Sequence, residues 1–243
     1  MMGWQWLKSL IYVIQVYLAM LVLGLVFLPW AALSPQGARV ACRSYAAYAM
    51  WSARWMLGLH HEIRGDIPTD EVLIAAKHQS FLDILIIFYY APVAKFIMKR
   101  ELLWTPIIGL YAWRLGCVPV DRGKRGAAIA KMIADVEKGR AQPGQLIIYS
   151  QGTRVAPGAY APYKVGTAVL YQQLGQPCVP AATNAGLFWP RKGILRKPGV
   201  AVVEFLPRIM PGMSRDAFMA HLEHEVETRS NQLLHEAGFT PKE

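Results

Sequence analysis

The chain has 243 residues, of which 54% are hydrophobic and 17% charged, and its formal net charge is +10. This length predicts one substantial core and a single main domain. Apolar and basic character together favour an anionic membrane surface or a phosphate-bearing substrate as partner. Nucleic acid would account for the charge but not for the hydrophobicity, and the sequence has no nucleic-acid-binding motif, so we exclude that class of partner.

The cysteines are far apart in the chain and each lies among apolar neighbours: Cys42, Cys117 and Cys178. Their spacing matches neither a metal site nor a disulfide framework, which favours a reducing compartment. We therefore expect no bound metal.

The N-terminal region carries an apolar stretch that is long enough to cross a bilayer. Residues 10–28 contain no charged side chain, and Lys8 precedes them. Tryptophans flank the stretch in positions suited to interfacial anchoring: Trp4, Trp6 and Trp30. A cleaved signal peptide is the alternative, but the stretch is too long and no clear small-x-small cleavage site follows it. We expect membrane insertion.

A second helix is predicted over residues 38–59, after a turn at residues 34–37 and with an end near Gly58. Its basic side chains fall within about 60° on a helical wheel: Arg39, Arg43 and Arg54. Such a stripe suits a helix lying in the membrane interface, or one packed on the domain with the stripe in water. Both arrangements remain open, and residues 1–59 are expected to form a membrane-anchoring element.

From His60 onward, short apolar runs alternate with helical patterns, which predicts an α/β domain over residues 60–243. We expect a mixed, largely parallel sheet of about seven strands flanked by helices. The expected strands lie near residues 61–65, 72–76, 94–98, 116–120, 145–149, 178–182 and 200–206. The expected helices lie near residues 81–90, 105–114, 126–139, 164–174 and 214–237.

The last of these helices is amphipathic, with a core-facing set of Phe218, Leu222, Val226 and Leu233 and a C-terminal stop at Gly238. It also carries His221 and His224. Their spacing matches no metalloprotease motif, so we expect them on the solvated face.

An imidazole and a carboxylate, His78 and Asp83, lie five residues apart at a predicted strand-to-helix turn. Ser80 is a plausible helix N-cap between them. Such a turn can bring Asp83 onto one ring nitrogen of His78 and leave the other nitrogen free to accept a proton. The pair alone is a weak motif, because a histidine near a strand end is often structural.

Three more stretches follow predicted strands. Lys99 and Arg100 follow one strand, residues 151–154 follow another, and residues 179–184 include a third strand end. Ligands of open α/β sheets bind beyond the carboxyl ends of strands, so these loops and His78 are expected on one rim. Within residues 151–154, Gly152 allows close backbone approach, Thr153 offers a hydroxyl and Arg154 offers a planar fork suited to phosphate.

In this order, the stretches resemble the motifs of the glycerolipid acyltransferases, in particular the 1-acyl-sn-glycerol-3-phosphate acyltransferases, over roughly residues 60–210. Residues 78–83 resemble the HxxxxD motif, and residues 99–102 with 116–122 resemble the second block. Residues 149–154, with Lys164 and Gly166 downstream, resemble the EGTR block, and residues 179–184 the proline-centred fourth block. The resemblance also implies an N-terminal two-helix membrane element.

The resemblance implies direct acyl transfer to the hydroxyl of an anionic lysophospholipid, foremost lysophosphatidic acid. His78 would take the hydroxyl proton and Asp83 would orient it, while Arg154 with Lys99, Arg100 or Arg122 would bind the phosphate. Gln151, Gly152 and Thr153 complete the expected substrate-binding set. The acyl donor would be a thioester of coenzyme A or acyl carrier protein, with no metal or redox cofactor. The catalytic domain would face the cytoplasm from the inner membrane.

One residue departs from the family pattern, because Gln151 occupies a position that is usually glutamate. An amide can donate and accept hydrogen bonds but cannot act as a base, so we expect Gln151 to hold a loop or a substrate hydroxyl. Two rival interpretations remain open. One is an acyltransferase for another lysolipid, such as lyso-ornithine lipid. The other is a non-catalytic membrane lipid-binding protein, against which an intact His78–Asp83 pair argues.

Overall fold

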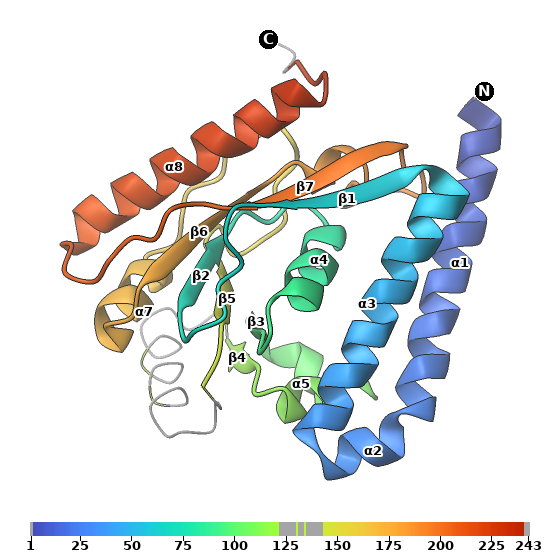
Figure 1. The fold of residues 1–243 in the computed structure, drawn as a ribbon, viewed down its shortest axis with the longest axis horizontal. Coiled ribbons are helices and arrows are strands. Elements are labelled where there is room, and N and C mark those ends of the chain that lie inside the picture. The colour runs from blue at the N-terminus through green and yellow to red at the C-terminus, as the bar shows by residue number, and fades with distance from the viewer. Residues whose placement is uncertain (1, 122–129, 131–133, 135–142, 241–243) are drawn as a thin grey trace.

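The computed structural model describes residues 2–121, 130, 134 and 143–240 of the chain. Arg122 and most of the helix predicted over residues 126–139 lie outside the described residues. The described elements run in chain order from the N-terminal helices to the long C-terminal helix α8 (Figure 1).

Three helices form the N-terminal region: α1 (Met2–Val26), α2 (Leu28–Leu33) and α3 (Pro35–Leu57). The turn predicted at residues 34–37 is wrong, because α3 already begins there. The Ser34 hydroxyl accepts a hydrogen bond from the Gln36 amide at 3.1 Å, and Pro35 occupies the first helical position. Serine at the N-cap followed by proline is a helix start, since proline has no amide hydrogen to leave unpaired there. The helix ends at Gly58 as predicted, with φ of +68°.

The N-terminal helices pack on each other and on the rest of the chain. Within the described residues, one helix, spanning Gly3–Val26, is long and apolar enough to cross a membrane. Few of its side chains are fully buried, and one of them, Tyr12, donates a hydrogen bond to the carbonyl of Ala49 in α3 at 3.0 Å. Arg43 of the predicted basic stripe donates to the carbonyl of Ala91 at 3.0 Å. That arginine therefore fixes α3 to the following domain.

The sheet confirms the predicted α/β class. It has seven strands in the order β1-β7-β6-β2-β5-β3-β4, and the β6–β7 pair alone is antiparallel among the paired strands. The strands are β1 (Leu59–Arg64), β2 (Leu73–Ala76), β3 (Lys95–Lys99), β4 (Val118–Val120), β5 (Leu146–Tyr149), β6 (Cys178–Thr183) and β7 (Gly199–Phe205).

The helices of the α/β part are α4 (Leu82–Tyr90), α5 (Ile108–Arg114), α7 (Gly166–Leu174) and α8 (Arg215–Glu236), with short 3₁₀ turns η1 (Arg100–Trp104) and η2 (Ala185–Leu187). The helix predicted over residues 105–114 is shorter than expected. Thr105 precedes Pro106, and a residue before proline is disfavoured in the helical conformation. Thr105 is accordingly extended, and α5 begins only at Ile108.

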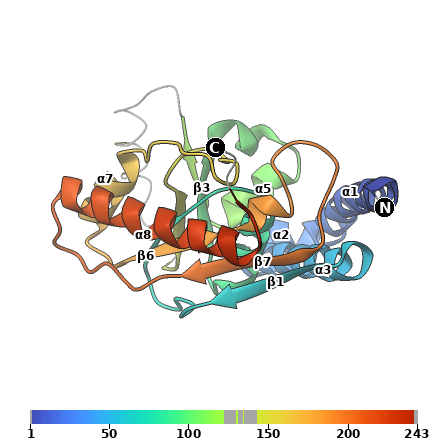
Figure 2. The same cartoon turned by 90° about the horizontal axis from the view of Figure 1, so that it is seen from above.

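Side chains alternate along the central strands and build one core on each face of the sheet. Ile74, Ile147 and Val179 join a core with α1, α3 and α4. Leu73 and Leu146 join a core with α7 and α8, which includes the predicted Phe218, Leu222 and Val226; buried Leu233 adds a small cluster against β6 and β7. Figure 1 shows α7 and α8 on one side of the sheet and α3 and α4 on the other. Seen from above, α1 and α3 lie at one end of the molecule and α7 at the other (Figure 2).

Candidate active site

The loop between β2 and α4 brings His78 and Asp83 together. Asp83 lies in the first turn of α4 and is fully buried, and its Oδ1 is 2.9 Å from Nδ1 of His78. Its Oδ2 accepts hydrogen bonds from the amides of Gln79 at 2.8 Å and Ser80 at 2.7 Å. Because a carboxylate only accepts, Nδ1 of His78 carries the hydrogen and Nε2 is the nitrogen that can accept a proton.

Tyr149, the last residue of β5, supports the imidazole from one side. Its ring stacks on His78 with centroids 3.9 Å apart and planes inclined by 19°. Burial, followed by the neighbouring Asp83 carboxylate, raises the pKa of Tyr149 well above its usual value. The phenol therefore stays neutral at physiological pH and holds the imidazole plane without adding a charge.

The predicted helix N-cap is displaced by one residue. Phe81 occupies the N-cap position of α4, without a side-chain cap. The Ser80 hydroxyl nevertheless accepts a hydrogen bond from the Leu82 amide at 3.0 Å and donates one to the carbonyl of Trp189 at 2.7 Å. Ser80 thus fixes both the helix start and the segment that follows η2, and so holds the turn between His78 and Asp83.

The loops after β2, β3 and β5 meet at one rim, as predicted. The strands β2, β3, β5 and β6 are parallel, so their carboxyl ends share one edge of the sheet. His78 follows β2, Lys99 ends β3, and Gln151 follows β5. The carbonyl of His78 accepts a hydrogen bond from the Val155 amide at 2.8 Å, so the loop that carries Arg154 lies directly against the His78 loop.

The turn after β5 has the backbone that its sequence predicts. Gly152 adopts a φ of +71°, which favours glycine, and its amide donates to the carbonyl of Tyr149 at 2.8 Å. Thr153 is exposed and Arg154 is half-buried. Lys99 and Arg100 are exposed at the start of η1. These side chains offer a hydroxyl and several cations at the same rim.

Sequence reasoning missed a further cation at this rim. Arg191 donates a hydrogen bond from Nη1 to the carbonyl of Arg154 at 3.2 Å and is exposed. It comes from the loop between η2 and β7, outside every recognised motif. The one signal in the sequence is the pair Arg191-Lys192 after Trp189-Pro190, and an exposed basic pair in a loop is common.

Of the two predicted roles for Gln151, holding a loop or holding a substrate hydroxyl, its contacts match the first. Its side chain is buried, and its Nε2 donates to the carbonyl of Ala161 at 3.2 Å and to Oε1 of Glu227 at 3.3 Å. The loop contact was predicted, but the partner on α8 was not. Nothing local in the sequence links residues 151 and 227, which lie in different halves of the fold.

The fourth predicted block serves the framework of the rim. The Thr183 hydroxyl donates to the carbonyl of Val202 at 2.7 Å, and Asn184 bridges the amide of Val202 and the carbonyl of Leu233. Both residues are buried. They tie the end of β6 to β7 and α8 rather than reaching the open rim.

Two other kinds of chemistry find no support among the described residues. His221 and His224 are exposed on α8, and no group of three histidine, cysteine or acidic side chains there could hold a metal ion. Burial raises the pKa of the Cys117 thiol to about 11 and that of Cys178 to about 12. Both thiols are therefore protonated at neutral pH, and neither has the thiolate character of a nucleophile.

Comparison with known proteins points to one family. A family model described as Acyltransferase matches residues 59–184. A 1-acyl-sn-glycerol-3-phosphate acyltransferase of Pseudomonas aeruginosa is 26% identical over 201 residues, which cover 82% of this chain and 78% of that protein. One of Limnanthes alba is 31% identical over 159 residues, covering 64% of this chain and 56% of that protein. The chain thus spans little more than half the length of the plant relative.

A solved structure shares the fold. The crystal structure of the 1-acyl-sn-glycerophosphate (LPA) acyltransferase PlsC from Thermotoga maritima matches with a TM-score of 0.76 and 18% sequence identity. The match covers 94% of this chain and 97% of that chain, so it includes the N-terminal helices as well as the sheet.

Proposed function

Because the chain belongs to the acyltransferase family, we propose that it transfers a fatty acyl chain from an acyl thioester to the sn-2 hydroxyl of lysophosphatidic acid, giving phosphatidic acid. The observation that carries this proposal is the His78–Asp83 pair at a rim that also presents Arg154. The names of the relatives favour lysophosphatidic acid as the acceptor. A base beside a phosphate-binding fork is what that acceptor needs, since it carries one free hydroxyl and one phosphate.

In the proposed reaction, Nε2 of His78 takes the proton of the acceptor hydroxyl as its oxygen attacks the thioester carbonyl carbon. The bond from carbon to oxygen forms, the bond from carbon to sulfur breaks, and the imidazolium returns its proton to the leaving thiolate. Asp83 holds Nδ1–H throughout and stabilises the imidazolium that forms. Its two backbone hydrogen bonds hold it in place.

Arg154 is proposed to bind the acceptor phosphate, because its guanidinium offers a planar fork of donors. Lys99 and Arg100 are exposed at the same rim, and Arg191 adds a further cation beside the Arg154 backbone. Arg122, predicted for the same role, stays a prediction. This basic rim also suits an acidic donor carrier, whether coenzyme A or acyl carrier protein. The mechanism calls for no metal or redox cofactor.

We propose that residues 1–59 anchor the protein in the inner membrane and that residues 60–243, the catalytic domain, face the cytoplasm. The apolar α1 supports the anchor, because most of the window that could span a bilayer is not covered by the rest of the chain. Alkaline carbonate extraction of membranes that contain the full-length protein tests this. We expect the protein in the pellet, and complete release into the supernatant would contradict an integral anchor.

The substrate proposal is tested by giving the purified protein a labelled acyl thioester and a panel of lysolipids, with His78→Ala as the inactive control. We expect phosphatidic acid from lysophosphatidic acid as the main product, acylated at sn-2. Preferential acylation of lyso-ornithine lipid would contradict lysophosphatidic acid as the acceptor but would still support the acyl-transfer reaction. Lipid binding without any acylated product would support the non-catalytic interpretation instead.

A further inference from the structure

Lys77, the residue before His78, forms a buried ion pair with Glu227 of α8. Its Nζ lies 2.6 Å from Oε1 and 2.5 Å from Oε2 of Glu227. The Lys77 side chain is 3% exposed and that of Glu227 is 19% exposed. A buried ammonium without a partner is costly, so the Glu227 carboxylate is what allows a lysine at this position.

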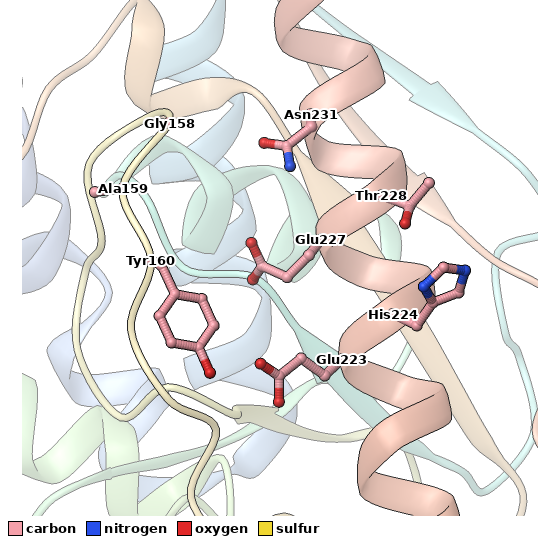
Figure 3. Close-up of a pocket in the computed structure, with 8 residues that line it drawn as sticks. All are labelled: Gly158, Ala159, Tyr160, Glu223, His224, Glu227, Thr228 and Asn231. Atoms are coloured by element: carbon pink, nitrogen blue, oxygen red, sulfur yellow. The ribbon is translucent and has the colours of Figure 1, made fainter. Parts of the chain in front are cut away.

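Glu227 also contacts the loop that follows β5. Its Oε1 accepts hydrogen bonds from the Tyr163 hydroxyl at 3.0 Å and from Nε2 of Gln151 at 3.3 Å. In Figure 3, the Glu227 side chain extends from α8 toward the loop of residues 158–160, across a cavity of about 300 Å³. One carboxylate therefore joins the residue before His78, the turn before Arg154, and α8.

We propose that Glu227 is a positioning residue, which supplies from α8 the carboxylate that the resemblance of residues 151–154 to the EGTR block would place at position 151. The side-chain ends of Gln151 and Glu227 are in contact, so a carboxylate on either can face the same lysine. Two carboxylates on one buried ammonium would repel each other, which explains why an amide accompanies Glu227 here. In this proposal the carboxylate lies on Glu227 and the neutral amide on Gln151, so Gln151 is not a sign of lost activity.

The relocated carboxylate acts on the active site through two short backbone links. Lys77 is bonded directly to His78, and the carbonyl of His78 accepts a hydrogen bond from Val155, the neighbour of Arg154. Holding Lys77 and Gln151 at a common point therefore fixes the relative position of the base and the proposed phosphate-binding arginine. A displacement of about 1 Å between such groups can lower a rate about 100-fold.

The test compares Glu227→Gln, Gln151→Glu and the double variant in steady-state assays of the full-length protein. The assays are run well below the lowest Tm among these variants, so that unfolding does not lower the measured kcat. We expect Glu227→Gln to lower kcat by about 10- to 100-fold, since its amide no longer neutralises Lys77. The double variant moves the carboxylate back to position 151 and should recover kcat to within about threefold of wild type. Glu225→Gln removes a charge from the same helix and is the matched control, with kcat unchanged.

A purely structural role predicts a different pattern. Glu227→Gln would then lower Tm and leave kcat near that of wild type, which would overturn the proposal. Equal kcat for the double variant and Glu227→Gln would overturn it as well. Should Glu227→Gln fail to fold, Lys77→Met/Glu227→Gln replaces the ion pair by two uncharged side chains. A tenfold or greater loss of kcat in that folded variant supports the positioning role, and an unchanged kcat overturns it.

This inference rests on the proposed function for the acyl-transfer reaction, whereas the choice of acceptor is tested separately. If wild type acylates another lysolipid in the panel, lysophosphatidic acid is the wrong acceptor, yet the same kcat ratios can be measured with the lipid that is used. If wild type acylates lysophosphatidic acid but the double variant does not recover kcat, the proposed function is supported and the proposed role of Glu227 is wrong.

Discussion

Lys77 and His78 are neighbours in the chain, and they point to opposite faces of the sheet, each toward a carboxylate. His78 meets Asp83 on the α4 side, and Lys77 meets Glu227 on the α8 side. Within the part of the chain that the structure describes, the other ring nitrogen of His78 has no hydrogen-bond partner, and the side chain is 13% exposed at the rim. The Lys77 pair is closed, because both carboxylate oxygens contact the ammonium.

This difference separates two uses of a buried charge pair. The open pair controls a tautomer and leaves a nitrogen available for proton transfer. The closed pair neutralises itself and joins segments that are far apart in the chain. Buried ion pairs are weak evidence for stability, since well-packed apolar residues often do as well. The closed pair is therefore better explained by the position that it enforces, and substitutions at four positions sharpen the contrast.

The largest effect is expected for His78→Ala. Loss of the base should lower kcat by about 10²–10⁴-fold, which is the usual contribution of a positioned acid or base. The side chain lies at the rim, so the Tm should change little. Turnover in detergent compared with a melting curve checks both points. Near wild-type turnover would contradict the mechanism.

Asp83→Asn should cost nearly as much activity, because an amide cannot stabilise the imidazolium and can bind the wrong tautomer of His78. The variant Asp83→Ala tests a second effect at the same position. Alanine would leave the amides of Gln79 and Ser80 buried without an acceptor. Each such group costs about 1–3 kcal/mol, so Asp83→Ala should also lower the free energy of unfolding. Urea titrations of both variants separate the two effects, and an Asp83→Ala protein as stable as wild type would contradict the second.

The contrast between the pairs also explains what the sequence could predict. His78 and Asp83 lie five residues apart, so one turn decides their contact and the motif is visible. Lys77 and Glu227 meet through the packing of α8 on the sheet, which no local pattern encodes. Most strands were predictable because they are short apolar runs between polar turns, and their parallel direction follows from the intervening helices. The edge strand β1 is the exception, since four of its six residues are polar or charged. The antiparallel β6–β7 pair depends on the path of the loop with η2, which hydrophobicity does not report.

Arg154→Ala should have an intermediate effect that is confined to the acceptor. Loss of a charge-assisted hydrogen bond costs about 1.5–3 kcal/mol, so the KM for lysophosphatidic acid should rise about tenfold to more than a hundredfold. Arg154→Lys keeps the charge but loses the fork, and should recover only part of the loss. The KM for the acyl thioester is the internal control and should change much less. Equal impairment for both substrates together with a lower Tm would assign Arg154 a role in holding its own loop.

The smallest effect is expected for Glu236, an acid on the exposed end of α8. It differs from Asp83 and Glu227 in that it contacts two cations. It contacts Arg64 of β1 at 2.5 Å and Arg229 of α8 at 2.9 Å, and it is 44% exposed. Hydrogen bonding to Arg64, and then to Arg229, holds the pKa of Glu236 below its usual value. Its stabilisation is therefore present above the ordinary glutamate pKa of about 4.3 and is lost as the pH falls through the lowered value.

Solvent screening limits what this exposed pair contributes, so Glu236→Gln should cost less than about 1 kcal/mol at pH 7. In a chain of this length, that is a fall in Tm of about 2–4 °C at most. The difference from wild type should shrink in acid, as the pH falls through the lowered pKa of Glu236, and in 1 M salt, where exposed pairs are screened. Melting curves at neutral and acid pH and at two salt concentrations check this. A fall in Tm as large as the one measured for Glu227→Gln would show that exposure does not distinguish the two pairs on α8. Position along the helix would then matter more than burial.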